Sequence, residues 1–111
     1  MLDKVMTKER LVSILEQARA KKQRLVFTNG CFDLMHIGHT RYLQAAKQLG
    51  DLLVVGINSD ASVKSLNKSL DRPILPEAPR AEVLAALGCV SYVVILSEAE
   101  HLNFHNTLQP M

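Results

Sequence analysis

The sequence predicts an α/β fold, a three-layer open parallel sheet with helices on both faces. Two observations predict it. Segments with the 3.6-residue apolar period of a helix alternate along the chain with short, continuously apolar runs. Those runs lack the alternation of a half-solvated strand, so both of their faces are expected to be buried, as in parallel sheets. Strands separated by helices pair in parallel through right-handed crossovers, which place helices on the sheet faces.

The first half of the chain is expected to alternate two helices with two strands. Thr7 is a good cap for the first helix, and apolar residues three and four positions apart give it one buried face. The second helix is followed by Gly50, where we expect a left-handed cap. The expected elements are a helix at 7–21, a strand at 25–28 with a turn at Asn29-Gly30, a helix at 36–49 and a strand at 52–57.

The second half continues the alternation. Asp60 can cap a short helix, and Pro76 and Pro79 suit the first turn of a longer one that Gly88 ends. Only three strands are visible in the whole chain, fewer than a doubly wound nucleotide-binding domain usually has. The expected elements are a helix at 60–66, a loop at 67–72, a helix at 77–87, a strand at 91–96 and a helix at 98–108.

Length and composition restrict the class of protein. A chain of 111 residues builds one core, so we expect a single domain over residues 1–111. Apolar residues make up 48% and charged residues 22%, which excludes a disordered or collagen-like chain. The net charge of +2 is too small to indicate a nucleic acid or a membrane surface as partner.

The sequence also predicts the compartment. It holds two cysteines, Cys31 and Cys89, too few for the disulfide framework of a small secreted domain. No stretch reaches the roughly 18 to 20 apolar residues of a membrane span, and the first residues lack the apolar run of a signal peptide. We therefore expect a cytoplasmic protein with reduced thiols.

The most informative segment lies between the first strand and the second helix. Residues 28–39 read TNGCFDLMHIGH. Gly30 permits close backbone approach, and Gly38 removes a side chain where the helix begins. His36 and His39 are three residues apart, so they point from one face of a helix N-terminus, where free amides and the helix dipole attract an anion. We expect a phosphate group here, with two imidazoles to stabilise charge that grows during its transfer.

Two alternatives exist for the histidine pair. The side chains can simply cap or pack at the helix start, or they can bind a transition metal. No third cysteine or histidine stands at a useful spacing, so we expect no metal site formed by protein side chains.

The motif His36-Ile37-Gly38-His39 and its surroundings resemble the HxGH nucleotidylyltransferases. The resemblance covers roughly residues 25–96. It is strongest to the cytidylyltransferase-like branch, which includes adenylyltransferase domains that produce ADP-heptose. The resemblance implies a Rossmann-like fold. The matching strings are Asn29-Gly30-Cys31-Phe32-Asp33, Val54-Val55-Gly56-Ile57-Asn58-Ser59-Asp60, Arg72-Pro73-Ile74 and Arg80-Ala81-Glu82-Val83-Leu84.

The resemblance implies a reaction and a set of site residues. A sugar-phosphate oxygen would attack the α-phosphate of ATP and release pyrophosphate, with Mg²⁺ on the phosphates and no covalent enzyme intermediate. His36, His39, Lys68 and Arg80 would contact the phosphates, although the alignment also allows Lys64 in place of Lys68. The residues expected to form the nucleotide pocket are Thr28, Asn29, Gly30, Cys31, Phe32, Asp33, Gly38 and Asp60.

Several of these residues have plain structural alternatives. Lys68 can be an ordinary solvated lysine, Asp33 and Asp60 can be turn or helix-cap residues, and Asp60 can instead accept a hydrogen bond from a substrate hydroxyl. Arg80 stands at a helix start, which disfavours a cation unless an anion is near, and its fork could grip the polyphosphate.

Members of the family continue into a further strand with a Lys-Gly-Gly-Asp-Tyr-like loop and a Ser-Thr-Thr-type helix, and this sequence ends at Met111 before them. We therefore expect a fold incomplete on its C-terminal side. The expected partners are a nucleotide and heptose 1-phosphate, with a homo-oligomer covering the open sheet edge and no nucleic acid or membrane. The alternatives are a cytidylyltransferase for glycerol 3-phosphate and a non-catalytic nucleotide-binding module.

Overall fold

The computed structural model describes residues 4–30, 32, 35–60 and 76–97. The loop expected at 67–72, the helix expected at 98–108 and all but the first residue of the helix expected at 60–66 lie outside this part. The described elements are β1 (Val5–Met6), α1 (Lys8–Ala20), β2 (Leu25–Gly30), α2 (Ile37–Lys47), β3 (Leu52–Asn58), α4 (Glu77–Ala85) and β4 (Tyr92–Leu96).

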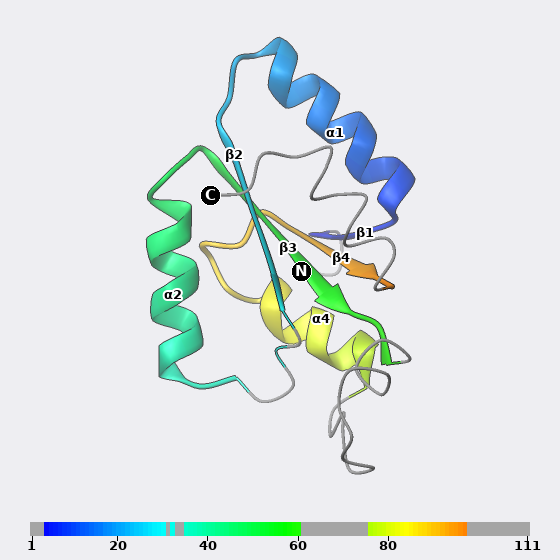
Figure 1. The fold of residues 1–111 in the computed structure, drawn as a ribbon, viewed down its shortest axis with the longest axis vertical. Coiled ribbons are helices and arrows are strands. Elements are labelled where there is room, and N and C mark those ends of the chain that lie inside the picture. Colours follow the sequence, from blue (N-terminus) through cyan, green and yellow to red (C-terminus); the bar gives the residue numbers. More distant parts are fainter. Residues whose placement is uncertain (1–3, 31, 33–34, 61–75, 98–111) are drawn as a thin grey trace.

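The strands form one parallel sheet in the order β1-β4-β3-β2 (Figure 1). The long pairing of β2 with β3 aligns Leu25 with Leu52 and Gly30 with Ile57. This confirms the expected parallel sheet and its three strands. The additional strand, β1, was not predicted because two residues are too short to show a period.

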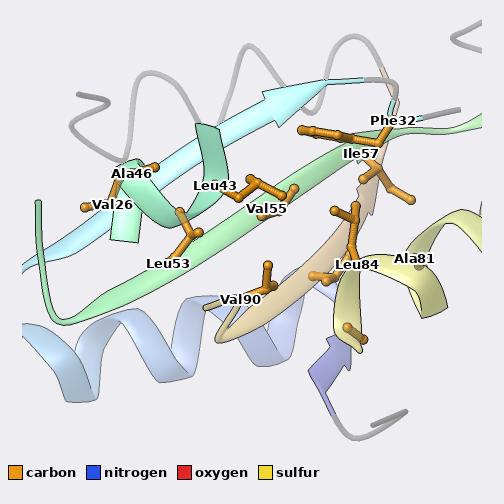
Figure 2. Close-up of a cluster of buried hydrophobic side chains, with 12 residues drawn as sticks. Val26, Phe32, Leu43, Ala46, Leu53, Val55, Ile57, Ala81, Leu84 and Val90 are labelled. Carbon is orange, nitrogen blue, oxygen red and sulfur yellow. The ribbon is translucent and has the colours of Figure 1, made fainter. Parts of the chain in front are cut away.

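The two faces of the sheet carry separate apolar clusters. On β3, Leu53, Val55 and Ile57 belong to the cluster that α2 and α4 cover, which Figure 2 shows around Val55. The intervening Val54 belongs to the cluster covered by α1. Because neighbouring side chains of a strand point to opposite faces, a continuously apolar strand fills both clusters. The fold is therefore the predicted three-layer α/β arrangement, with helices on both faces of the sheet.

The ends of the helices agree with the sequence-based predictions in part. Thr7 caps α1 as predicted, since its hydroxyl accepts from the Arg10 amide at 3.2 Å. The left-handed cap expected at Gly50 is wrong, because no glycine has a positive φ. A Cβ at Gly50 would lie 2.7 Å from the Arg24 carbonyl oxygen, so this glycine allows close packing of α2's exit against the start of β2. Helix α4 ends two residues earlier than predicted, at Ala85.

None of the helices in the described ranges combines the length and the apolar character that crossing a bilayer requires.

Candidate functional site

The carboxyl ends of β2, β3 and β4 meet at one edge of the sheet. Gly30 at the end of β2 pairs with Ile57, and Asn58 at the end of β3 pairs with Leu96. In open parallel sheets, ligands bind beyond this edge. Helix α2 begins there, after the connection from β2, so its N-terminus lies at the edge where the sequence predicts a phosphate (Figure 1).

His36 and His39 form a reciprocal cap at the start of α2. The Nδ1 of His36 accepts from the Gly38 amide at 3.0 Å, and the Nδ1 of His39 accepts from the His36 amide at 3.2 Å. A ring nitrogen that accepts a hydrogen bond carries no proton, so each imidazole in this arrangement is neutral and carries its proton on Nε2. The cap leaves two Nε2–H donors from adjacent rings.

The two rings lie close together, and the ring of His39 also contacts Phe32. The His36 and His39 ring centroids are 4.0 Å apart, and the edge-on contact between Phe32 and His39 has a centroid distance of 5.6 Å. Partial burial, and then the nearby His36, lower the pKa of His39 below its ordinary value. His39 is therefore neutral near pH 7, in agreement with the accepting role of its Nδ1.

Two glycines make room for this arrangement. A Cβ at Gly38 would lie 2.7 Å from Cε1 of His36, and a Cβ at Gly30 would lie 2.8 Å from Cε2 of Phe32. Phe32 itself has a φ of 49° and is buried in the core below His39. The structure thus places Phe32 as a support for His39, two residues after the end of β2. The expected pocket residues Asn29 and Gly30 belong to that strand and not to the predicted turn, because both pair with β3.

Thr28 and Tyr42 connect β2 to α2. The Thr28 hydroxyl lies 2.8 Å from the Tyr42 hydroxyl, and the Thr28 side chain is buried under α2. Thr28 was predicted in the nucleotide pocket, and that role stays a prediction beside the hydrogen bond that its hydroxyl makes to Tyr42. Tyr42 was not predicted as part of the site. The signal that could have identified it is its spacing, three residues after His39 on α2.

Asp60 and Arg80 come together at the start of α4. Nη2 of Arg80 donates to Oδ1 of Asp60 at 2.8 Å, and the exposed fractions of these side chains are 0% and 35%. The Asp60 amide donates to Oε1 of Glu77 at 2.9 Å. Asp60 thus lies next to the predicted pocket edge, just after β3, and Arg80 is its ion-pair partner.

Most of the predicted site residues that the structure describes fall into two groups, and the other predicted residues lie outside the described part. His36, Gly38 and His39 lie together at the start of α2 with Phe32, while Asn29 and Gly30 end β2 on the same side. Asp60 and Arg80 form the second group. Within the described residues, no group of three or more histidine, cysteine or acidic side chains is arranged to hold a metal ion. The predicted site residues that lie outside the described part are Cys31, Asp33 and Lys68, with the alternative Lys64.

Comparison with known proteins agrees with this geometry. The family model described as cytidylyltransferase-like matches residues 27–110. The bifunctional proteins HldE of Geotalea uraniireducens and Helicobacter pylori are 53% and 51% identical over 107 residues, which is 96% of this chain. The chain spans 22% of the length of these relatives.

A solved structure shares the fold. The crystal structure of the lipopolysaccharide core biosynthesis protein from Thermoplasma volcanium matches with a TM-score of 0.69 and 30% sequence identity, over 79% of this chain and 70% of that one. The family match covers most of the chain, including the turn that carries the two histidines. The chain therefore belongs to the cytidylyltransferase-like family, the nucleotidylyltransferase family that its HxGH motif resembles.

Proposed function

We propose that this chain forms a nucleotidylyltransferase site that transfers AMP from ATP to heptose 1-phosphate and releases pyrophosphate. The observation that carries the proposal is the start of α2, where two imidazoles present Nε2–H donors beside the helix amides. Support for the acceptor comes from the resemblance to ADP-heptose-forming domains and from identities of about 50% to proteins named HldE.

The reaction needs positioning and charge stabilisation from the protein. An oxygen of the sugar phosphate forms a bond to the α-phosphorus of ATP, and the bond from that phosphorus to the bridging oxygen of pyrophosphate breaks. His36 and His39 donate hydrogen bonds to the phosphate oxygens on which negative charge grows. Asn29 and Gly30 border the nucleotide at the end of β2. No group of the protein acts as a nucleophile.

The amides at the start of α2 also take part in phosphate binding. In the structure the Gly38 and His36 amides donate to imidazole nitrogens. A phosphate oxygen is a stronger acceptor for these amides, because it carries a charge and faces the positive end of the helix dipole. Binding therefore exchanges the histidine caps for a phosphate cap, and the rings turn their donors toward the same anion.

Mg²⁺ would supply charge neutralisation on the triphosphate. Because Mg²⁺ keeps several waters and is usually held by one or two carboxylates and by substrate phosphates, a three-ligand protein site is not required. Asp60, a carboxylate near this edge, is already paired with Arg80, so the substrate phosphates themselves would hold the Mg²⁺. Cys31, Asp33 and Lys68 remain proposed as site residues on the resemblance alone.

Pyrophosphate release tests the function. The purified chain is incubated with Mg²⁺, with ATP or CTP, and with heptose 1-phosphate or glycerol 3-phosphate. We expect ATP with heptose 1-phosphate to give the fastest release, and His36→Ala and His39→Ala each to lower it by about 10²-fold or more. Fastest release from CTP with glycerol 3-phosphate would instead identify the cytidylyltransferase alternative. A melting temperature raised by ATP without turnover would identify a binding module.

A further inference from the structure

The first turn of α4 holds Asp60 at two points. Glu77 accepts from the Asp60 backbone amide at 2.9 Å, and Arg80 donates to the Asp60 carboxylate at 2.8 Å. Glu77 and Arg80 are three residues apart, so they project from one face of the helix. Asp60 is fixed both in its backbone position after β3 and in the direction of its carboxylate, by residues 17 and 20 positions away in the chain.

The burial of Arg80 indicates what this cation does. Its side chain is 0% exposed, whereas the Asp60 side chain is 35% exposed. A guanidinium withdrawn from water is stable only beside partners with good geometry, and the Asp60 carboxylate at 2.8 Å is such a partner. A polyphosphate arriving from solvent meets the exposed carboxylate of the pair and not the buried guanidinium. The sequence-based expectation that Arg80 grips the polyphosphate does not fit this arrangement.

We propose that Arg80 and Glu77 are positioning residues that hold the Asp60 carboxylate as an acceptor for a substrate hydroxyl, and that Arg80 does not bind the polyphosphate. The inference rests on the proposed function, because it needs a substrate at this sheet edge. A carboxylate repels phosphate and accepts strongly from hydroxyl groups. It therefore recognises the hydroxylated ring of a substrate, either the ribose of ATP or the sugar of the acceptor.

The test compares ligands with and without such hydroxyls. Calorimetry measures the binding of three ligands to the variants Arg80→Lys, Glu77→Ala, Glu77→Gln and Asp60→Asn. The ligands are pyrophosphate, ATP, and heptose 1-phosphate, the last in the presence of a non-hydrolysable ATP analogue. We expect pyrophosphate affinity to stay within about twofold of the parent in all four variants. Affinity for a hydroxylated ligand should fall about tenfold or more in Asp60→Asn, Arg80→Lys and Glu77→Ala, as expected for a lost hydrogen bond to a charged group.

The pattern of affinity losses identifies which substrate carries the hydroxyl and how Glu77 and Arg80 act. A loss confined to ATP assigns the hydroxyl to the ribose, and a loss confined to heptose 1-phosphate assigns it to the acceptor sugar. Glu77→Gln keeps an amide oxygen at the accepting position and should bind like the parent, which a purely charge-based role would not allow. The double variant Arg80→Lys with Asp60→Asn should bind no more weakly than Asp60→Asn alone, because Arg80 acts through Asp60.

Two outcomes overturn the proposal. One is a tenfold loss of pyrophosphate affinity in Arg80→Lys, and the other is unchanged binding of every hydroxylated ligand in Asp60→Asn. If Arg80→Lys does not fold, the variants Asp60→Asn and Glu77→Ala still test whether Asp60 accepts a hydrogen bond from a substrate hydroxyl. Glu82→Ala on the exposed side of α4 and Arg10→Lys on α1 are the matched controls. The variant His39→Ala distinguishes the proposed nucleotidylyltransferase function from the proposed role of Asp60. If His39→Ala binds pyrophosphate as tightly as the parent, the result counts against the proposed function and leaves the role of Asp60 untouched.

Discussion

His36 and His39 form the helix cap that the sequence offered as one alternative, and their phosphate-binding role stays a prediction. A spacing of three residues places two side chains on one helix face, and it also matches the N-cap and N3 positions of a capping box. The structure shows the cap, with both Nδ1 atoms accepting from amides. The same bonds leave the proton on Nε2 before substrate binds, and Nε2 is the atom that the proposed phosphate site uses.

Acidification should weaken the fold through His39. Its pKa is lowered in the folded protein from the ordinary 6.5, so the unfolded chain takes up a proton first as the pH falls. The free energy of unfolding should therefore decrease below pH 6.5, toward the lowered folded pKa. Urea unfolding at several pH values measures this. His39→Gln should flatten that part of the profile, and stability that rises on acidification would contradict the prediction.

Gly38→Ala should impair the site without unfolding the protein. Alanine favours a helix over glycine, but the new Cβ would lie 2.7 Å from Cε1 of His36 and displace that ring. A catalytic group misplaced by about 1 Å can cost about 10²-fold in rate, so we expect a loss approaching that in pyrophosphate release. Gly88→Ala is the control, because nothing lies within 4 Å of its added Cβ. Equal turnover in the two variants would contradict this role of Gly38.

At the scale of elements, α2 is attached to the sheet by its apolar face and by a hydrogen bond between two hydroxyls. Leu43 and Ala46 are buried against the sheet, and Tyr42 reaches the Thr28 hydroxyl. Because Thr28 lies in the last half of β2, this contact joins the helix to the strand end that precedes the histidine turn. It is the kind of attachment that fixes a helix start relative to a strand.

Tyr42→Phe should destabilise the fold by about 1 kcal/mol, because it removes the partner of a buried hydroxyl. The measurement is the midpoint of urea unfolding at unchanged slope. Tyr92→Phe is the matched control, since the Tyr92 hydroxyl makes no hydrogen bond within the part of the chain that the structure covers. A Tyr42→Phe variant as stable as the control would show that the contact contributes nothing.

The elements themselves were largely predictable, and their exceptions have local causes. Apolar periods of three and four residues predicted α1 and α2, and continuous apolar runs predicted β2, β3 and β4. Strand β1 is too short to carry a period. The role of Gly50 was misjudged because a glycine after a helix favours a left-handed cap in general, whereas here it is required by the nearby Arg24 carbonyl.

At the scale of the whole molecule, the sheet is stabilised by apolar clusters on both faces. Helix α1 supplies Leu11 and Leu15 to one cluster, and α2 and α4 supply the other. The motif and the family resemblance predicted a site at the start of α2, and that location stays a prediction. The Thr28–Tyr42 and Glu77–Asp60 contacts were not predictable, because they join residues that only the tertiary arrangement brings together. The expected homo-oligomer stays a prediction, which light scattering can check.

Neighbouring positions of α1 test the cluster on that face. Leu11→Ala should cost about 2 to 5 kcal/mol, because Leu11 is fully buried and its truncation leaves a cavity. Val12→Ala should change stability by no more than about 0.5 kcal/mol, because Val12 is 43% exposed and lies on the solvent side of the helix. Thermal unfolding measures both. Similar melting temperatures for the two variants would show that α1 does not seal the sheet.

The reciprocal histidine cap has a consequence for repeated turnover. Under the proposed function, the Nδ1 atoms accept from the His36 and Gly38 amides between substrates, so departure of the anion leaves neither amide without an acceptor. In each catalytic cycle, the acceptor of these two amide hydrogens changes from an imidazole Nδ1 to a phosphate oxygen and back. The first turn of the helix can thus persist through emptying and refilling, with no coil formed in between.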